Sequence, residues 1–116
     1  MKYIVDTHAL IWIVTEDSRL SNKAKKIYLD NKNDIYLSMA SVWELAIKSS
    51  LKKISLGMPL EEFVDEHVRG NDIGIIDIQL PHVLGIELLP FHHRDPFDRL
   101  IISHLISVLF SPVHPI

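Results

Sequence analysis

The segment YIVDTHALIWIV, residues 3–14, joins a short apolar strand to a short helix through one aspartate. Residues 3–5 are aromatic or β-branched and apolar on both faces, which is typical of a strand buried in a parallel sheet. The run HALIWIV at 8–14 predicts a helix directly after it. Asp6 closes the strand, where apolar surroundings give a carboxylate little structural purpose. Asp6 is therefore the first candidate for a functional residue.

The same alternation of strand and helix continues along the chain. Apolar runs rich in β-branched residues predict further strands at 34–38 and 73–78. Amphipathic patterns with capping residues predict the other helices, at 21–30, 41–53, 59–70, 80–90 and from Asp95 onward. Strands separated by helical crossovers indicate an α/β fold with a parallel sheet and helices on both faces. At 116 residues we expect one domain over 1–116.

Composition excludes several classes of protein. The chain is 47% hydrophobic and 23% charged, which indicates a folded globular protein and not a disordered one. Its net charge of -3 excludes a polybasic protein, so a nucleic acid would be contacted through local basic groups and metal ions. The absence of cysteine excludes disulfides, thiolate zinc sites and a cysteine nucleophile, and fits a reducing cytoplasm.

The apolar segments are too short to cross a membrane. The longest, LIISHLISVLF at 100–110, has about 11 residues where a span needs about 20. The first apolar segment contains Asp6 and lacks a cleavage site of small residues, which argues against a signal peptide. We therefore expect a cytoplasmic protein without membrane contact.

A second acidic residue, Glu44, follows the second predicted strand. It lies in the expected first turn of the helix at 41–53, and so at the same sheet edge as Asp6, where parallel α/β proteins bind ligands. Ser41 and Glu44 also have the spacing of a capping box, which would make Glu44 purely structural. Ser38 or Ser41 could orient a phosphate or a water molecule there.

Two more acids flank a proline in HHRDPFDRL, residues 92–100. Pro96 suits the first position of a helix, which makes Asp95 the N-cap and Asp98 the third helical residue. Both carboxylates would then be stabilised by backbone N–H groups and by the helix dipole. Residues three apart also share one helix face, so the pair is equally suited to a hard divalent cation. The spacing leaves both interpretations open.

Together these acids predict a metal site. If the helix after Asp95 starts at the same edge, then Asp6, Glu44, Asp98 and Asp95 converge on one pocket, where only a cation relieves their repulsion. Oxygen ligands of this kind favour Mg²⁺ or Mn²⁺. Such an ion activates water and offsets charge on a phosphate, which is typical of phosphodiester hydrolysis. A receiver-like or phosphatase-like domain acting on small phosphates is a weaker alternative.

Aromatic and basic residues give a weaker signal. Trp12 and Trp43 lie on apolar helix faces, which favours core packing over stacking on bases. The basic residues that could contact a nucleic-acid backbone lie mostly on solvated helix faces: Lys23, Lys25, Lys26, Lys48, Lys52, Lys53, Arg94 and Arg99.

Three strings, VDTHALIW at 5–12, LSMASVWELAIK at 37–48 and HHRDPFDRLIISH at 92–104, occur in this order. Together they resemble a PIN domain of the VapC-like toxin type over nearly the whole chain. The resemblance implies a three-layer α/β/α sandwich and a ribonuclease dependent on Mg²⁺ or Mn²⁺. It further implies RNA as the substrate, a cognate antitoxin protein as a partner, and a homodimer.

The same resemblance implies roles for particular residues. Asp6, Glu44 and Asp98 match the acidic metal-site residues of the family, and Asp95 belongs to this version of the third motif. In the family a further strand and a Thr-x-Asp or Ser-x-Asp segment follow, whereas this sequence has no acidic residue after Asp98. We therefore expect C-terminal strands that are missing or reduced. The alternative function is a catalytically impaired, shortened PIN-domain protein that binds its antitoxin or itself without turnover.

Overall fold

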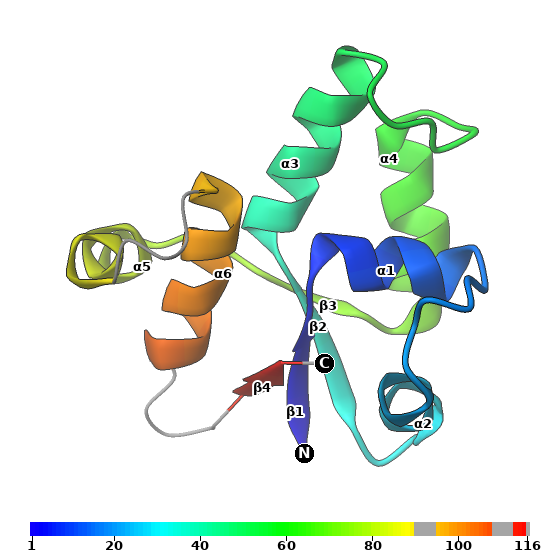
Figure 1. The fold of residues 1–116 in the computed structure, drawn as a ribbon, viewed down its shortest axis with the longest axis horizontal. Coiled ribbons are helices and arrows are strands. Elements are labelled where there is room, and N and C mark those ends of the chain that lie inside the picture. Colours follow the sequence, from blue (N-terminus) through cyan, green and yellow to red (C-terminus); the bar gives the residue numbers. More distant parts are fainter. Residues whose placement is uncertain (90–94, 108–112, 116) are drawn as a thin grey trace.

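A parallel sheet of four strands, in the order β3-β2-β1-β4, forms the centre of the molecule (Figure 1). The computed structural model describes residues 1–89, 95–107 and 113–115. The strands are β1 (Lys2–Val5), β2 (Asp34–Ser38), β3 (Gly74–Ile76) and β4 (Val113–Pro115). All three strands predicted from the sequence are present, and a fourth, β4, which was not predicted, pairs with β1 in parallel.

The register of the strands aligns their carboxyl ends. Val5 pairs with Leu37, and the next residue of β2, Ser38, pairs with Ile76. Asp6, which follows Val5, therefore emerges at the same edge as the residues that follow β2 and β3.

Helices cover both faces of the sheet, so the α/β/α sandwich expected from the sequence is confirmed (Figure 1). One outer layer consists of α1 (Thr7–Val14), α2 (Asn22–Leu29) and α4 (Leu60–Phe63), which continues as a π-helical segment (Val64–Val68) and a 3₁₀ turn (Arg69–Asn71). The other consists of α5 (Leu80–Gly85), a 3₁₀ turn (Ile86–Leu88) and α6 (Pro96–Ser107). The remaining helix, α3 (Met39–Ser50), starts at the carboxyl edge of β2.

The sheet has one apolar core on each of its faces, which explains why apolar residues follow one another in the sequence of its strands. Val5 belongs to the core under α1 and α4, while its neighbour Ile4 belongs to the core under α6. Successive side chains of a strand point to opposite faces, so a sheet covered on both faces needs apolar residues at every position. Helix α3 contributes to both cores, through Leu45 on one side and Ala40 on the other.

Helix α3 differs from its prediction in both its start and its inward face. It begins at Met39, because Ser38 is the N-cap and its Oγ accepts a hydrogen bond from the Ala40 N–H at 3.0 Å. The predicted start at Ser41 and the capping box were therefore wrong. The prediction that Trp43 faces inward was also wrong, since Trp43 is 51% exposed. The buried face contains the polar Ser41 and Glu44, so the apolar pattern indicated the wrong side of the helix.

Helix α6 is anchored in its layer by both apolar and polar contacts. Leu100 and Ile101 are buried in the second core, and Arg99 Nη2 donates to the Ile86 carbonyl at 3.0 Å. The Ser103 hydroxyl donates to the His82 carbonyl of α5. A Cβ at Gly85 would lie 2.8 Å from Ser103 Oγ, so the glycine permits this close approach. Within the described ranges, no helix is both long and apolar enough to cross a membrane.

The burial of Leu45 generates a stability prediction. Leu45 of α3 is fully buried in the first core, whereas Leu51, the C-cap of the same helix, is 59% exposed. Leu45→Ala is expected to lower the free energy of unfolding by about 2–5 kcal/mol, because it leaves a cavity. Leu51→Ala, the matched control, should change it by less than about 0.5 kcal/mol. Urea denaturation measures both, and equal effects would contradict this packing.

Candidate functional site

Asp6 lies at the carboxyl end of β1 and starts α1. It is the N-cap, and its Oδ1 accepts a hydrogen bond from the Ala9 N–H at 2.7 Å. The Asp6 side chain therefore has a structural role that the strand pattern did not reveal, and the prediction that it had little structural purpose was wrong. Asp6 remains exposed, and its Oδ2 accepts no hydrogen bond from the described part of the chain.

Glu44 is a buried carboxylate, with only 3% of the residue exposed. Its Oε1 accepts a hydrogen bond from the Thr7 hydroxyl at 2.6 Å, and its Oε2 accepts one from Lys48 Nζ at 2.5 Å. A buried carboxylate requires such compensation, because it has lost its hydration. Thr7 follows Asp6 directly, so this contact brings the Glu44 carboxylate to the start of α1.

The start of α6 is held against α3 by aromatic packing. The rings of Trp43 and Phe97 meet edge to face, with centroids 5.1 Å apart and an interplanar angle of 87°. Trp43 immediately precedes Glu44, and Phe97 lies between Asp95 and Asp98 in sequence. The amino ends of α1, α3 and α6 consequently all lie toward the carboxyl edge of the sheet (Figure 1).

Asp95 has the capping role predicted from the proline motif. Pro96 is the first residue of α6, and Asp95 Oδ1 accepts a hydrogen bond from the Phe97 N–H at 2.8 Å. The Asp95 carbonyl accepts a second bond from the Arg99 N–H at 3.1 Å. Asp98 is the third residue of α6, and its side chain lies outside the described residues, as do His92, His93 and Arg94.

The donor set at this edge fits a hard cation in its chemistry. Asp6 and Glu44 supply carboxylate oxygens, and Ser41 lies three residues before Glu44 on the same face of α3. The Ser41 hydroxyl is buried and has no hydrogen-bond partner within the described structure. Among the residues with described side chains, no three histidine, aspartate or glutamate residues are grouped to hold a metal ion.

Two contributors to this geometry were missed or misread in the sequence. Thr7 follows Asp6 in the first motif, but nothing in its spacing indicated a contact with α3. Lys48 was considered only as a contact for nucleic acid, although it lies four residues after Glu44 on α3, the spacing of an ion pair within a helix.

Comparison with protein families identifies the chain. A family model described as the PIN domain matches residues 3–108, which include Asp6, Glu44, Asp95 and Asp98. The chain belongs to the PIN domain family. This membership supports a nuclease-type fold and function, and PIN-domain nucleases generally use divalent metal ions. No significant match was found among curated proteins or among solved structures.

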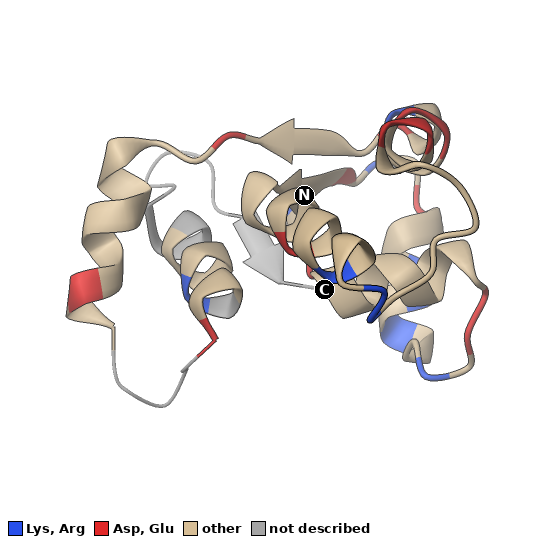
Figure 2. Cartoon of the chain, turned by 90° about the horizontal axis from the view of Figure 1, so that it is seen from above, with Lys and Arg blue, Asp and Glu red and all other residues tan. Residues whose placement is uncertain are grey.

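The charges of this PIN domain are distributed over many elements. Figure 2 shows Lys and Arg on several helices and loops, with Asp and Glu between them. This pattern agrees with the net charge of -3 and indicates that an anionic ligand would be recognised by a few local groups.

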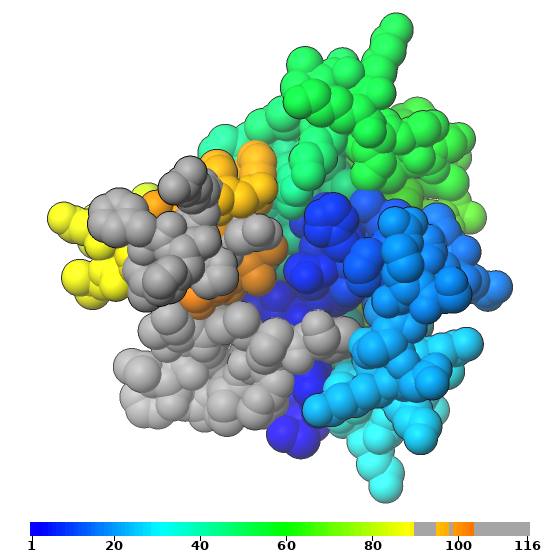
Figure 3. Space-filling model, in the orientation of Figure 1, coloured from blue at the N-terminus to red at the C-terminus, as the bar shows by residue number. Residues whose placement is uncertain are grey.

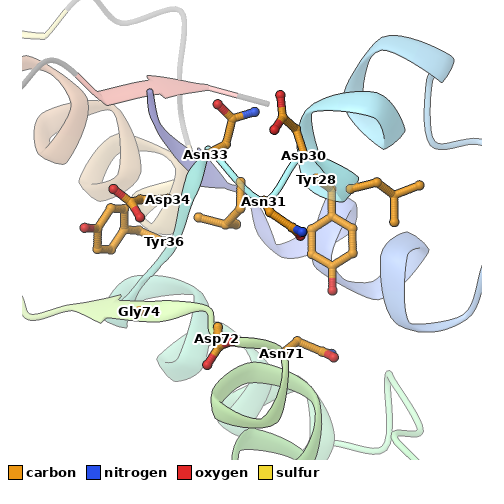
Figure 4. A pocket seen from close by; sticks show the side chains of 11 residues that line it. Tyr28, Asp30, Asn31, Asn33, Asp34, Tyr36, Asn71, Asp72 and Gly74 are labelled. Atoms are coloured by element: carbon orange, nitrogen blue, oxygen red, sulfur yellow. The ribbon is translucent and has the colours of Figure 1, made fainter.

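A polar cavity of about 530 Å³ lies at the opposite edge of the sheet. It is lined by the segment between α2 and β2 and by residues just before β3, including Asp34, Tyr36, Asp72 and Gly74 (Figure 4). Apart from Ile35 and Tyr36 within β2, these residues precede or begin the strands, so the cavity lies away from the edge with Asp6 and Glu44. Asp34, at the far end of β2, is consequently a useful control for the acids of the site.

The loop between α1 and α2 carries an exposed ion pair near Asp6. Arg19 Nη2 and Nε donate to the Asp17 carboxylate at 2.7 Å and 3.1 Å. These hydrogen bonds are the main cause that lowers the pKa of Asp17 from 3.8 to about 2, and they raise the pKa of Arg19 in turn. The pair and the contact of the guanidinium with Trp12 place Arg19 beside α1.

The Thr7 contact generates a second stability prediction. Thr7→Val keeps the shape of the side chain but removes the hydroxyl that donates to buried Glu44. We expect the free energy of unfolding to fall by about 1–3 kcal/mol, because a buried carboxylate oxygen loses its partner. Thr15→Val is the matched control, since Thr15 is an exposed residue at the other end of α1. A loss no larger than that of the control in chemical denaturation would contradict the role of Thr7.

The Asp17 pair generates a pH prediction. Its carboxyl should titrate at about pH 2 in the native protein and move back toward 3.8 in Arg19→Gln. Because folding lowers this pKa, any stabilisation by the pair is fully present above the ordinary value and is lost as the pH falls through about 2. Carboxyl ¹³C NMR measures the titration, and an unchanged curve in the variant would contradict the pairing.

Proposed function

We propose that this PIN-domain protein is a metal-dependent endoribonuclease of the VapC-like toxin type, using Mg²⁺ or Mn²⁺ to hydrolyse RNA phosphodiester bonds. The observation that carries the proposal is that Asp6 caps α1 at the carboxyl edge of the sheet, while the next residue, Thr7, donates a hydrogen bond to the Glu44 carboxylate. In a chain of this family, two carboxylates at that edge are suited to hold a divalent ion against a phosphate. We take residues 1–116 as a single PIN-like domain that acts in the cytoplasm.

In this proposal Asp6, Glu44 and Asp98 hold the ion, and Asp95 positions the start of α6 and adds negative charge. When bound, the ion supplies an activated water and offsets charge that develops on the phosphate. The chain orients the acids: the Ala9 N–H fixes the Asp6 carboxylate, and Thr7 fixes that of Glu44. Lys48 neutralises Glu44 from the other side, so it competes with a metal ion for Oε2.

A protein partner is supported by exposed apolar side chains. On α3 and its C-cap they recur every four residues, at Trp43, Ile47 and Leu51. On α5 and the turn that follows, a second set is formed by Leu80, Val83, Leu84 and Leu88. Grouped apolar residues on a surface mark protein contacts more often than isolated ones do. We assign these faces to a cognate antitoxin protein and to a second copy of the chain in a homodimer.

A second candidate function is a catalytically impaired PIN-domain protein that binds its antitoxin or self-associates without turnover. It is favoured by one observation, that both oxygens of Glu44 already accept hydrogen bonds, from Thr7 and Lys48. A carboxylate so well satisfied is a poorer ligand, since a metal ion must displace the Lys48 ammonium first.

A cleavage assay separates the two candidates. The purified chain is incubated with a pool of structured RNA and Mg²⁺ or Mn²⁺, and EDTA is added to a parallel reaction. Asp6→Asn keeps a residue that caps α1 but removes a metal ligand. The cleavage rate of Asp6→Asn should fall by at least about 10- to 100-fold. That is the loss typical of removing a side chain that hydrogen-bonds to a metal ligand, and removal of a ligand should cost at least as much. Asp34→Asn, at the opposite end of β2, should cleave at the wild-type rate.

The outcomes are distinct. Cleavage that requires both the ion and Asp6 supports the ribonuclease. Folded protein that cleaves no RNA with either ion overturns it and favours the binding protein. Equal activity of Asp6→Asn and Asp34→Asn would show that any observed cleavage does not use Asp6.

A further inference from the structure

Asp6 borders a cavity of about 500 Å³ that is lined by residues of α1, of the loop that follows it and of the start of α2. The cavity walls include His8, Trp12, Arg19 and Ser21. In the space-filling view, α1 and the segment leading to α2 form adjoining blue surfaces on one face of the molecule (Figure 3). A proposed catalytic acid therefore shares a cavity with two aromatic rings and a guanidinium.

The two rings project from one face of α1. His8 and Trp12 are four residues apart, and their ring centroids are 6.2 Å apart with planes inclined by 37°. Trp12 was predicted to pack in the core, but the structure leaves it half-buried and gives part of its surface to the cavity. His8 is exposed. Both rings are thus accessible to a planar ligand that enters from the Asp6 side.

Arg19 adds a planar cation to the same cavity. Its guanidinium carbon lies 5.4 Å from the centroid of the Trp12 ring, a cation–π contact. Asp17 accepts hydrogen bonds from Nε and Nη2, which leaves Nη1 without a partner in the described part of the chain. A guanidinium that is already held in place loses little freedom on binding a phosphate, and its open N–H groups suit that anion.

We propose that this cavity is the subsite for one unpaired nucleotide of the RNA substrate, next to the phosphate that reacts at Asp6. The base stacks on the His8 and Trp12 rings, and Arg19 binds the adjoining phosphate. The inference rests on the proposed ribonuclease function and names the form of RNA that this site accepts. Single-stranded RNA is recognised through bases that stack on aromatic and guanidinium planes, whereas a paired base has no free face to offer. The volume lies within the range of about 300–1,000 Å³ that is typical of small-ligand sites.

A simpler interpretation makes Arg19 and Trp12 a structural contact that fastens the α1–α2 loop to α1. The two interpretations differ in a measurable way. A structural contact affects the stability of the fold, whereas a nucleotide subsite affects the affinity for single-stranded RNA at unchanged stability. The test therefore measures binding directly, apart from cleavage.

The chain contains two tryptophans, so Trp43→Phe leaves Trp12 as the only indole reporter. This variant is titrated in EDTA, which prevents metal-dependent cleavage, with a labelled RNA hexamer as a single strand and as a duplex. We expect the single strand to quench Trp12 fluorescence and the duplex to leave it unchanged. His8→Ala and Arg19→Gln, made in the same background, should each raise the Kd by about fivefold or more, the effect of one lost stacking contact.

Arg69→Gln is the matched control for Arg19→Gln. The side chains of Arg19 and Arg69 are both 69% exposed and each has an aspartate partner, but Arg69 pairs with Asp65 of the π-helical segment that follows α4. The control removes the same charge and should change the Kd by less than about twofold, since an isolated surface charge contributes little at moderate salt. If Arg19→Gln lowers the melting temperature, Arg19→Lys keeps the charge without the planar group and should still weaken binding.

The results separate failure of the subsite from failure of the ribonuclease. In one outcome, fluorescence anisotropy shows that the RNA binds, and the RNA is cleaved with Mg²⁺ or Mn²⁺, but Trp12 is not quenched and both variants bind normally. The proposed subsite is then wrong, and the proposed ribonuclease function stands. Equal quenching by the duplex also overturns the subsite. If the RNA is neither bound nor cleaved, the proposed function fails and the subsite fails with it.

Discussion

The buried carboxylate of Glu44 is the constraint on which the site depends. A carboxylate that is 3% exposed must be neutralised and hydrogen-bonded, and the chain does this from two sides. Thr7 donates from the start of α1, and Lys48 donates from the next turn of α3. The same contacts fix α1 against α3 and so set the position of Asp6, which is itself the cap of α1. Fold and candidate site therefore share the same hydrogen bonds.

The second outer layer is attached to this frame through α6. The edge-to-face contact of Trp43 with Phe97 brings the start of α6 to α3, and Leu100 and Ile101 seal the core beneath it. Asp95 stabilises the first turn of α6 by capping it, so one acid of the proline motif contributes to the fold and not only to charge at the site. Three helices thus begin at one edge of the sheet, where their amino ends favour anions such as a phosphate.

Much of the architecture could be predicted because local patterns and packing agree. The strands were visible as apolar runs, since a sheet covered on both faces needs apolar residues at every position. Helix α3 was misread for the opposite reason: its inward face carries Ser41 and Glu44, while apolar Trp43 and Ile47 are exposed. A polar inward face is expected where a fold is shaped for function, and there the apolar pattern fails as a guide.

By itself, the sequence determined the α/β class, the positions of β1, β2 and β3 and the capping role of Asp95, and it named the acids of the proposed site. These follow from side-chain periodicity and from residues close together in the chain, which local rules describe well. Only the tertiary structure decided that Thr7 and Lys48 hold Glu44, and that His8, Trp12 and Arg19 share a cavity with Asp6. Thr7 and Glu44 are 37 residues apart, and such a contact depends on how α1 and α3 pack over the sheet, which no local pattern encodes.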